Sequence, residues 1–209
     1  MKKLFGNIKM TWPRVILFAV ITGIYTGLVL IIDALKDTSF QDIGIAYEWW
    51  VIFAVIVVVN CKSNLDAMLK CFVFFLISQP VIFAVQVPFG KLSAEQGIYY
   101  YKNIWFFATL LTLPGGWIAY YAKRQNLFGA AVLGIGNTIQ LVMACSYAYK
   151  AIADFPHHLL SAVVSVASMF IMSFCIQKKA RCRVVSLCLP LVLAGALAVF
   201  AYVTGRLNF

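Results

Sequence analysis

The sequence predicts an all-α integral membrane protein, a bundle of seven transmembrane helices that forms a single domain over residues 1–209. Of the 209 residues 63% are hydrophobic and only 11% are charged, whereas a soluble domain carries about 25% charged residues. The mean hydropathy is +0.91. Apolar runs also recur along the whole chain, many of them near the length of about 20 residues that a helix needs to cross a bilayer.

Charges and turn residues divide the chain into seven apolar segments, at residues 14–33, 45–60, 67–89, 103–122, 127–149, 159–176 and 184–204. The first follows a basic stretch but is too long for a signal peptide and lacks a small-residue cleavage site, so we expect a retained span. The second and sixth are close to the lower limit of about 17 residues. A bundle of six helices is therefore the alternative. Trp49 and Trp50 lie at one end of the second segment, where interfacial aromatic residues belong.

The segments between the apolar runs are short and leave no room for a separate soluble domain. The longest are residues 35–44 and 90–103. We expect each to form a short interfacial helix, and the whole chain to form one domain.

The distribution of charge predicts the orientation. If the N-terminus is cytoplasmic, twelve of the 17 lysines and arginines fall on the inner side and six of the seven acidic residues fall on the outer side. An excess of lysine and arginine marks the cytoplasmic side, so we expect the C-terminus to be extracytoplasmic. The net charge of +10 then reflects orientation and contact with anionic lipids and indicates no nucleic-acid partner. The chain has no Asn-x-Ser/Thr acceptor site, which favours a bacterial plasma membrane as its location.

Neutral polar residues collect near the middle of the predicted spans, where no ionisable residue lies. Buried carboxylates usually mark proton pathways in membranes, so this pattern argues against a proton-coupled carrier. The candidate ligand-binding residues are Tyr25, Gln79, Thr112, Asn137 and Gln140. The candidate hinge residues beside them are Pro80, Pro114, Gly115 and Gly116. Transporters place interrupted helices around substrate sites at this depth.

These residues lead to the first functional hypothesis, a small multi-pass membrane protein that binds or translocates a neutral polar or amphipathic molecule at broken helices. Neutral polar side chains also join membrane helices by hydrogen bonds. The second hypothesis is therefore an accessory or interaction subunit without transport activity of its own. The Gly23-x-x-x-Gly27 spacing fits close helix packing, within the chain, with a partner helix or with a second copy.

The third hypothesis is an outer-face metal-dependent hydrolase built on acidic residues and the histidines of the 154–158 segment. Asp154, His157 and His158 could contribute to a divalent metal site. However, the chain has no His-x-x-x-His or His-Glu-x-x-His spacing, and adjacent helical residues point about 100° apart. Nucleophile-elbow and phosphate-binding motifs are also missing. The sequence thus names no catalytic residue, metal ligand or cofactor, and it argues against an enzyme.

Overall fold

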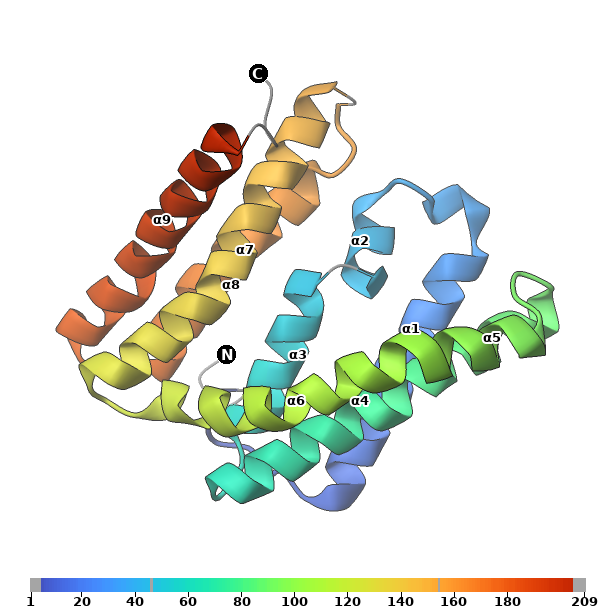
Figure 1. The fold of residues 1–209 in the computed structure, drawn as a ribbon, viewed down its shortest axis with the longest axis horizontal. Coiled ribbons are helices and arrows are strands. Elements are labelled where there is room, and N and C mark those ends of the chain that lie inside the picture. The colour runs from blue at the N-terminus through green and yellow to red at the C-terminus, as the bar shows by residue number, and fades with distance from the viewer. Residues whose placement is uncertain (1–4, 46, 154, 205–209) are drawn as a thin grey trace. The chain divides into compact units, whose positions relative to one another are not determined.

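The computed structural model describes residues 5–45, 47–153 and 155–204, and the regular elements in these ranges are helical (Figure 1). Within this part of the chain, five helices are long and apolar enough to cross a membrane, over Trp12–Ile31, Asn64–Phe89, Leu127–Ala153, Leu159–Ile176 and Ala180–Phe200. The all-helical class is confirmed, and the helices have the length and composition of a multi-pass membrane protein. The count of seven spans remains a prediction.

The chain divides into two compact units, residues 2–120 and 121–209, which we call the N-terminal and the C-terminal unit. The N-terminal unit contains α1 (Trp12–Ile31), η1 (Asp33–Leu35), α2 (Ser39–Ile45), α3 (Tyr47–Val59), α4 (Asn64–Gln86), η2 (Val87–Phe89), α5 (Ala94–Tyr100), the π-helical η3 (Tyr101–Trp105), α6 (Phe106–Ala119) and the first residue of η4 (Tyr120–Lys123). Short helices occupy both of the long connecting segments, as predicted. The second apolar segment is a helix of only 13 residues, α3, because the residues before it form the separate helix α2.

Helices α1 and α4 run parallel and pack through two glycines. A Cβ atom on Gly23 would lie 2.8 Å from the Ser78 carbonyl oxygen, and one on Gly27 would lie 2.7 Å from Val85 Cβ. Gly27, which follows Gly23 on α1, thus contacts Val85, which follows Ser78 on α4, so the two helices run in the same direction. The Gly23-x-x-x-Gly27 pattern is used within the chain, as a groove that admits α4. Since the two helices are parallel, the chain must turn back between them, and α3 lies in that interval.

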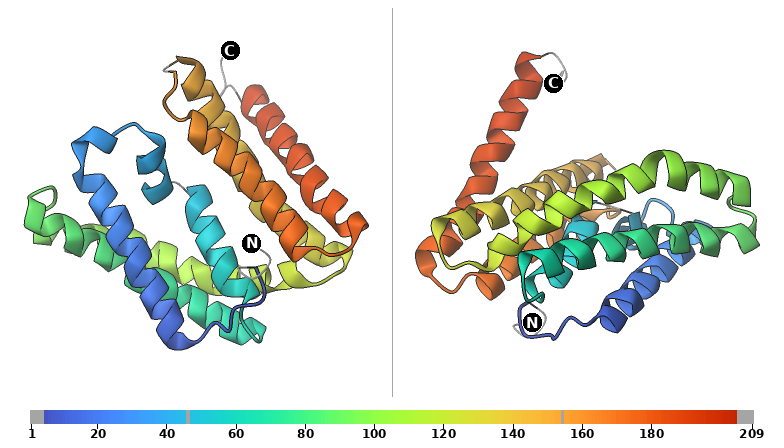
Figure 2. Two further views of the ribbon diagram at one scale, coloured as in Figure 1. Left: turned by 180° about the vertical axis from the view of Figure 1, so that it is seen from behind. Right: turned by 60° about the horizontal axis from the view of Figure 1, so that its bottom comes forward.

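Helix α6 runs antiparallel to α4 in the N-terminal unit, as both views in Figure 2 show. Gly116 near the end of α6 packs against Cys71 near the start of α4, with a distance of 3.0 Å from an ideal Cβ position to Cys71 Cβ. Gly97 on α5 packs against Phe83, near the other end of α4. The Tyr120 hydroxyl then donates to the Lys62 carbonyl over 2.7 Å. The chain therefore returns along α4 to the level at which α4 began.

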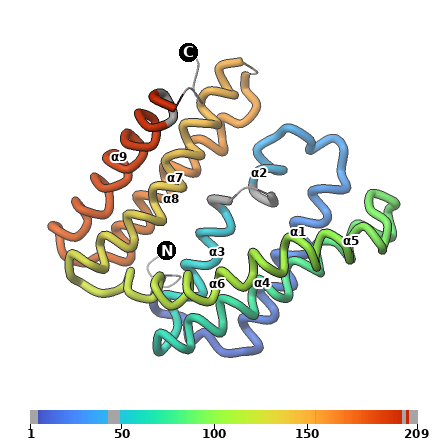
Figure 3. The backbone as a smooth tube through the Cα atoms, viewed as in Figure 1, coloured from blue at the N-terminus to red at the C-terminus, as the bar shows by residue number. Residues whose placement is uncertain are grey.

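Within its described residues, the C-terminal unit contains the rest of η4 and three α-helices, α7 (Leu127–Ala153), α8 (Leu159–Ile176) and α9 (Ala180–Val203), which follow one another in the tube drawing of Figure 3. Short connections make consecutive helices antiparallel. Both α8 and α9 pack on α7, and Gly134 brings α9 close, with a distance of 3.0 Å from an ideal Cβ position to Leu189 Cδ2. The core of this unit includes buried methionines of α8, Met169 and Met172, together with Leu133 and Tyr147 of α7.

Candidate functional site

Asn137, a predicted ligand-binding residue, joins all three helices of the C-terminal unit. Its fully buried amide nitrogen donates to the Ser173 hydroxyl of α8 over 2.9 Å and to the Ser186 carbonyl of α9 over 3.0 Å. The second acceptor has a local cause. Pro190 lies four residues after Ser186 inside α9, and a proline leaves the carbonyl four residues earlier without its helical donor. The Asn137 side chain therefore supplies the hydrogen bond that Pro190 removes.

Gln140, another predicted ligand-binding residue, also serves the packing of this unit. It is fully buried, and its side-chain oxygen accepts from the Ser168 hydroxyl of α8 over 2.9 Å. Ser168 shares one buried face of α8 with Ser161 and Ser165. Both amides of α7 thus contact neighbouring helices, which is the common use of neutral polar residues in membrane helices.

Tyr25 and Thr112, two more predicted ligand-binding residues, belong to the N-terminal unit. The Tyr25 hydroxyl donates to the Phe40 carbonyl over 3.4 Å, and the side chain is 36% exposed. The Thr112 hydroxyl donates to the carbonyl of Thr109, three residues earlier, over 2.6 Å. Each hydroxyl therefore has a backbone acceptor within its own unit.

Gln79 differs from these four residues because its amide makes no hydrogen bond with any part of the chain that the structure describes, although the residue is only 4% exposed. It lies on α4 one turn before Phe83 and two turns after Cys71. These two residues contact Gly97 of α5 and Gly116 of α6, and residues four apart share a helical face. Helical periodicity therefore directs Gln79 toward the contact between α4 and α6.

A second buried polar residue, Thr109, lies at the same level of this contact. Thr109 precedes Gly116 by seven residues on α6, and Gln79 follows Cys71 by eight residues on α4. Gly116 and Cys71 touch, and the two helices are antiparallel. Moving back along α6 from Gly116 to Thr109 and forward along α4 from Cys71 to Gln79 therefore leads in the same direction. Each move covers about 10–12 Å at 1.5 Å per residue. Thr109 is 2% exposed. Helical spacing therefore puts two buried neutral polar residues at a similar level of the α4–α6 contact.

The candidate hinges do not interrupt their helices. Pro80 lies inside α4, and Pro114 lies inside α6 together with Gly115 and Gly116. What each proline removes is one backbone hydrogen bond. The carbonyl deprived by Pro80 belongs to Leu76, which precedes Gln79 by three residues on a neighbouring position of the helix surface. The feature predicted as a break in the chain is a local gap in the hydrogen bonding of a continuous helix.

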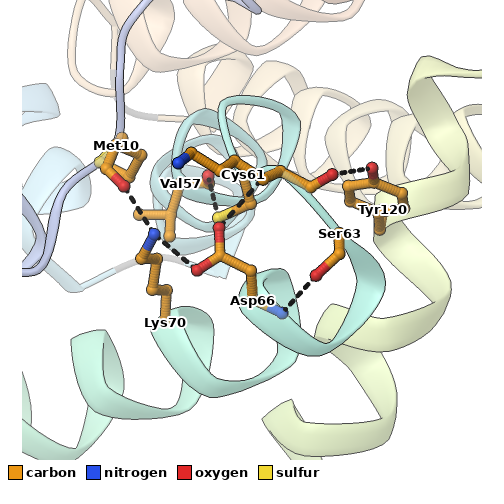
Figure 4. Close-up of polar contacts among 8 residues, drawn as sticks. Met10, Val57, Cys61, Ser63, Asp66, Lys70 and Tyr120 are labelled. Carbon is orange, nitrogen blue, oxygen red and sulfur yellow. Dashed lines mark hydrogen bonds and ion pairs between the residues drawn. The ribbon is translucent and has the colours of Figure 1, made fainter.

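A buried ion pair at the opposite end of α4 was not among the predicted sites (Figure 4). Lys70 is 5% exposed, and its ammonium group lies 2.6 Å from an Asp66 carboxylate oxygen and donates to the Met10 carbonyl over 2.6 Å. The same ammonium lies 5.5 Å from the centre of the Trp12 ring. Asp66 also accepts from the Lys62 backbone N–H, and its own N–H donates to the Ser63 hydroxyl that caps α4.

This ion pair fastens the segment before α1 to the start of α4. Asn60, at the end of α3, adds two more links, because its side-chain oxygen accepts from the backbone N–H groups of Gly6 and Ile8 over 3.1 and 2.8 Å. Phe5 and Met10 of the same segment are buried. Residues 5–11, before the first span, are therefore an ordered part of the N-terminal unit.

The sequence did contain a signal for the ion pair. Asp66 is the only acidic residue on the predicted inner side, and it stands four residues before Lys70, the spacing of a helical ion pair. The prediction counted both residues only as contributions to orientation. Nothing in their spacing indicates that Met10 and Trp12 bury the lysine, because that contact joins residues 60 positions apart.

The C-terminal unit carries two apolar grooves, and neither is lined by a predicted ligand-binding residue. One of about 520 Å³ lies between α7 and α8, and it is lined by Leu141, Ala144, Cys145, Ala148, Ala162, Val163, Val166 and Ala167. The other, of about 420 Å³, lies between α7 and α9 and is lined by Ile135, Thr138, Ile139, Leu193, Ala196 and Leu197. Their linings offer contacts for acyl chains or apolar helices.

At the predicted outer side, no three His, Cys, Asp or Glu side chains gather within the described residues to hold a metal ion. Asp154, a member of the hydrolase hypothesis, lies outside the described residues. The ring of His158 stacks on Tyr147 at 5.8 Å. Asp33 pairs with Lys91 over 2.6 Å, and the hydrogen bond and charge of that lysine hold the pKa of the Asp33 carboxyl below its ordinary value.

The observations therefore select one part of the N-terminal unit, the α4–α6 contact around Gln79, as the candidate functional site. The Asn137 nitrogen and the Gln140 oxygen have partners on neighbouring helices, although the Asn137 side-chain oxygen is buried without a hydrogen bond among the described residues. The Lys70 ion pair has its own backbone acceptor. Compared with protein-family models, curated proteins and solved structures, the chain matches none of them.

Proposed function

We propose that this multi-pass membrane protein binds or translocates a neutral polar or amphipathic small molecule at the α4–α6 contact of the N-terminal unit. Gln79 is the principal polar contact, and Thr109 and Thr112 stand on the opposite helix. Tyr25 lies on the other side of α1 from Gly23 and Gly27, which contact α4, and its hydroxyl donates to the Phe40 carbonyl. It therefore takes no part in the site of this proposal. Pro80, Pro114, Gly115 and Gly116 supply the flexibility. Asn137 and Gln140, which have partners within the C-terminal unit, act as structural residues in this proposal.

The observation that carries the proposal is Gln79. The residue is 4% exposed, its amide has no hydrogen-bond partner among the described residues, and the amide atoms are not among those fully sealed from the surface. An amide without a hydrogen bond in an apolar medium costs on the order of 2–7 kcal/mol. In lipid such a group must find a neighbouring helix, a water molecule or a ligand. The Leu76 carbonyl, freed by Pro80, offers an acceptor one turn away. A ligand or water that bridges the two groups would satisfy both.

Cysteine accessibility tests this proposal without knowledge of the substrate. The six native cysteines are replaced by serine, and Gln79→Cys is exposed to a small water-soluble methanethiosulfonate reagent in oriented vesicles. We expect modification from at least one side. Ser78→Cys is the matched control, because Ser78 is the preceding residue, is fully buried and has its carbonyl oxygen against Gly23 of α1. It should remain unmodified.

The second candidate function, an interaction subunit, is favoured by the small-residue groove between α7 and α8. Alanine-lined surfaces let membrane helices approach closely, and the groove lies beside the hydrogen-bonded pair Gln140 and Ser168. In this case the Gln79 amide would lie in a dry helix contact, and Gln79→Cys would resist the reagent as fully as Ser78→Cys. That result would overturn the transport proposal.

A further inference from the structure

Six basic side chains gather at one end of the C-terminal unit. They come from two connections, residues 123–126 between η4 and α7 and residues 177–183 at the junction of α8 and α9, and neither stretch contains an acidic residue. The six are Lys123, Arg124, Lys178, Lys179, Arg181 and Arg183. A concentration of one sign of charge creates a field that attracts the opposite charge.

Two glutamines hold these connections together. The Gln125 side chain donates to the Ile176 carbonyl over 2.9 Å and accepts from the Lys178 backbone N–H over 2.6 Å. Gln177 reciprocates, because its side chain donates to the Ala122 carbonyl over 2.6 Å. Each connection is thus tied to the backbone of the other. The backbone that carries the cations after Gln177 is therefore held beside the backbone that carries those before Gln125.

Two helix N-termini add to the positive field at the same end. Helix α7 begins at Leu127 and α9 at Ala180, one at each connection. A helix carries the equivalent of about half a positive charge at its N-terminus. Asn126 caps α7 by accepting from the Gly129 N–H over 2.9 Å, and the remaining first-turn N–H groups reinforce attraction for an anion.

Exposed apolar side chains lie beside this basic end, as expected of a helix end at the surface of a bilayer. Phe128, Phe174 and Val184, each within a few residues of the cations, are 56%, 52% and 59% exposed. The Arg183 guanidinium lies 5.2 Å from the centre of the Phe174 ring, so charge and apolar surface meet there. Lipid headgroups occupy this boundary, with the phosphate at the level of the cations and the acyl chains along the helices.

We propose that the two connections form a binding site for the headgroup of an anionic phospholipid. The cations of both connections and the two helix N-termini contact the phosphate, and the glutamine links keep the site open and in register. The site belongs to the C-terminal unit and is independent of the function proposed for Gln79.

Lipid retention by the full-length protein tests the site. The protein is reconstituted into nanodiscs that contain phosphatidylcholine and phosphatidylglycerol. It is then released from them, and the lipids that stay bound to it are identified by native mass spectrometry. The variant Lys178→Gln, Lys179→Gln, Arg181→Gln should lose preference for phosphatidylglycerol by roughly 100-fold, since each cation near the surface contributes about a factor of five. The control variant Lys36→Gln, Lys102→Gln, Lys150→Gln removes the same charge from exposed positions elsewhere and should retain the preference.

Gln125→Leu separates a built site from charge alone. It removes the links to Ile176 and Lys178 and leaves the net charge unchanged, so we expect a measurable loss of phosphatidylglycerol preference. Retention of the full preference by Gln125→Leu would overturn the proposed two-loop site. So would an equal loss in the two charge-removal variants, or equal retention of phosphatidylcholine and phosphatidylglycerol by the unmodified protein.

Discussion

At the scale of single residues, the best-defined interaction is the hydrogen bond from Asn137 to the carbonyl that Pro190 leaves without a donor. We predict that Asn137→Ala lowers the free energy of unfolding by about 1–3 kcal/mol, because two buried acceptors lose their partner. Pro190→Ala restores a backbone donor for the Ser186 carbonyl. In the Pro190→Ala variant, Asn137→Ala should therefore lower the free energy of unfolding by about 0.6 kcal/mol less than it does in the native chain. Unfolding in mixed detergent, followed by circular dichroism, measures both. Equal costs in the two backgrounds would show that the Ser186 contact contributes nothing.

A second prediction at this scale compares two lysine–aspartate pairs of equal length. Lys70 is buried beside Asp66, whereas the Lys91–Asp33 pair is exposed, and both distances are 2.6 Å. Lys70→Met should lower the free energy of unfolding by about 1–3 kcal/mol, because it leaves the Met10 carbonyl and the Asp66 carboxylate, whose side chain is 21% exposed, without the ammonium. Lys91→Met should have no measurable effect near neutral pH, because exposed pairs contribute little.

The pH dependence of the exposed pair follows from the sign of its pKa shift. Lys91 lowers the pKa of Asp33 in the folded protein, so the pair adds stability above the unfolded pKa of about 3.9. That small contribution is lost as the pH falls through the lower folded pKa. Titration of the Asp33 carboxyl by NMR should therefore show its pKa rise in Lys91→Met, and an unchanged pKa would contradict the assignment.

At the scale of elements, adjacent glycines of α6 make a matched pair. An ideal Cβ on Gly116 would lie 3.0 Å from Cys71 Cβ, whereas nothing lies within 4 Å of one on Gly115. We predict that Gly116→Ala separates α6 from α4 and destabilises the protein by about 1–3 kcal/mol. Gly115→Ala should be neutral or stabilising by about 1 kcal/mol, because alanine favours the helix. Thermal unfolding in detergent compares them. Equal effects of the two substitutions would contradict the packing described for α4 and α6.

Much of the helix pattern was accessible from the sequence, and the reason is physical. Apolar runs bounded by charge predicted the long helices, since crossing hydrocarbon demands both length and an unbroken apolar composition. Composition alone does not determine how residues 33–60 divide into η1, α2 and α3, because the whole stretch is helix-compatible. Nor does it reveal partners. Asn137, Gln140 and Gln79 appear equivalent in sequence, yet the first two meet donors or acceptors on neighbouring helices and the third meets none. That distinction depends on long-range packing.

At the scale of the whole molecule, the direction of the helices within each unit bears on the number of spans. In the N-terminal unit α1 and α4 are parallel and α6 is antiparallel to α4, so the chain traverses that unit four times if α3 is included. The C-terminal unit adds three helices. Helix α3 has 13 residues, or about 20 Å at 1.5 Å per residue, which is shorter than the hydrocarbon core of about 30 Å. By length alone, α3 would not count as a membrane span. If α1 and α4 both cross the membrane in the same direction, however, the chain between them must cross back, and α3 is the helix in that interval.

The side on which α5 lies distinguishes the two counts. With seven spans and a cytoplasmic N-terminus, α5 lies outside. If only the five long helices cross, residues 90–126 all lie inside. In a background without native cysteines we predict that Glu95→Cys, on exposed α5, reacts with a membrane-impermeant maleimide on intact cells. Arg124→Cys should react only after permeabilisation under either count, which makes it the inner control. Protection of Glu95→Cys in intact cells, with reaction after lysis, would contradict the seven-span arrangement and leave α3 and α6 as helices that do not cross.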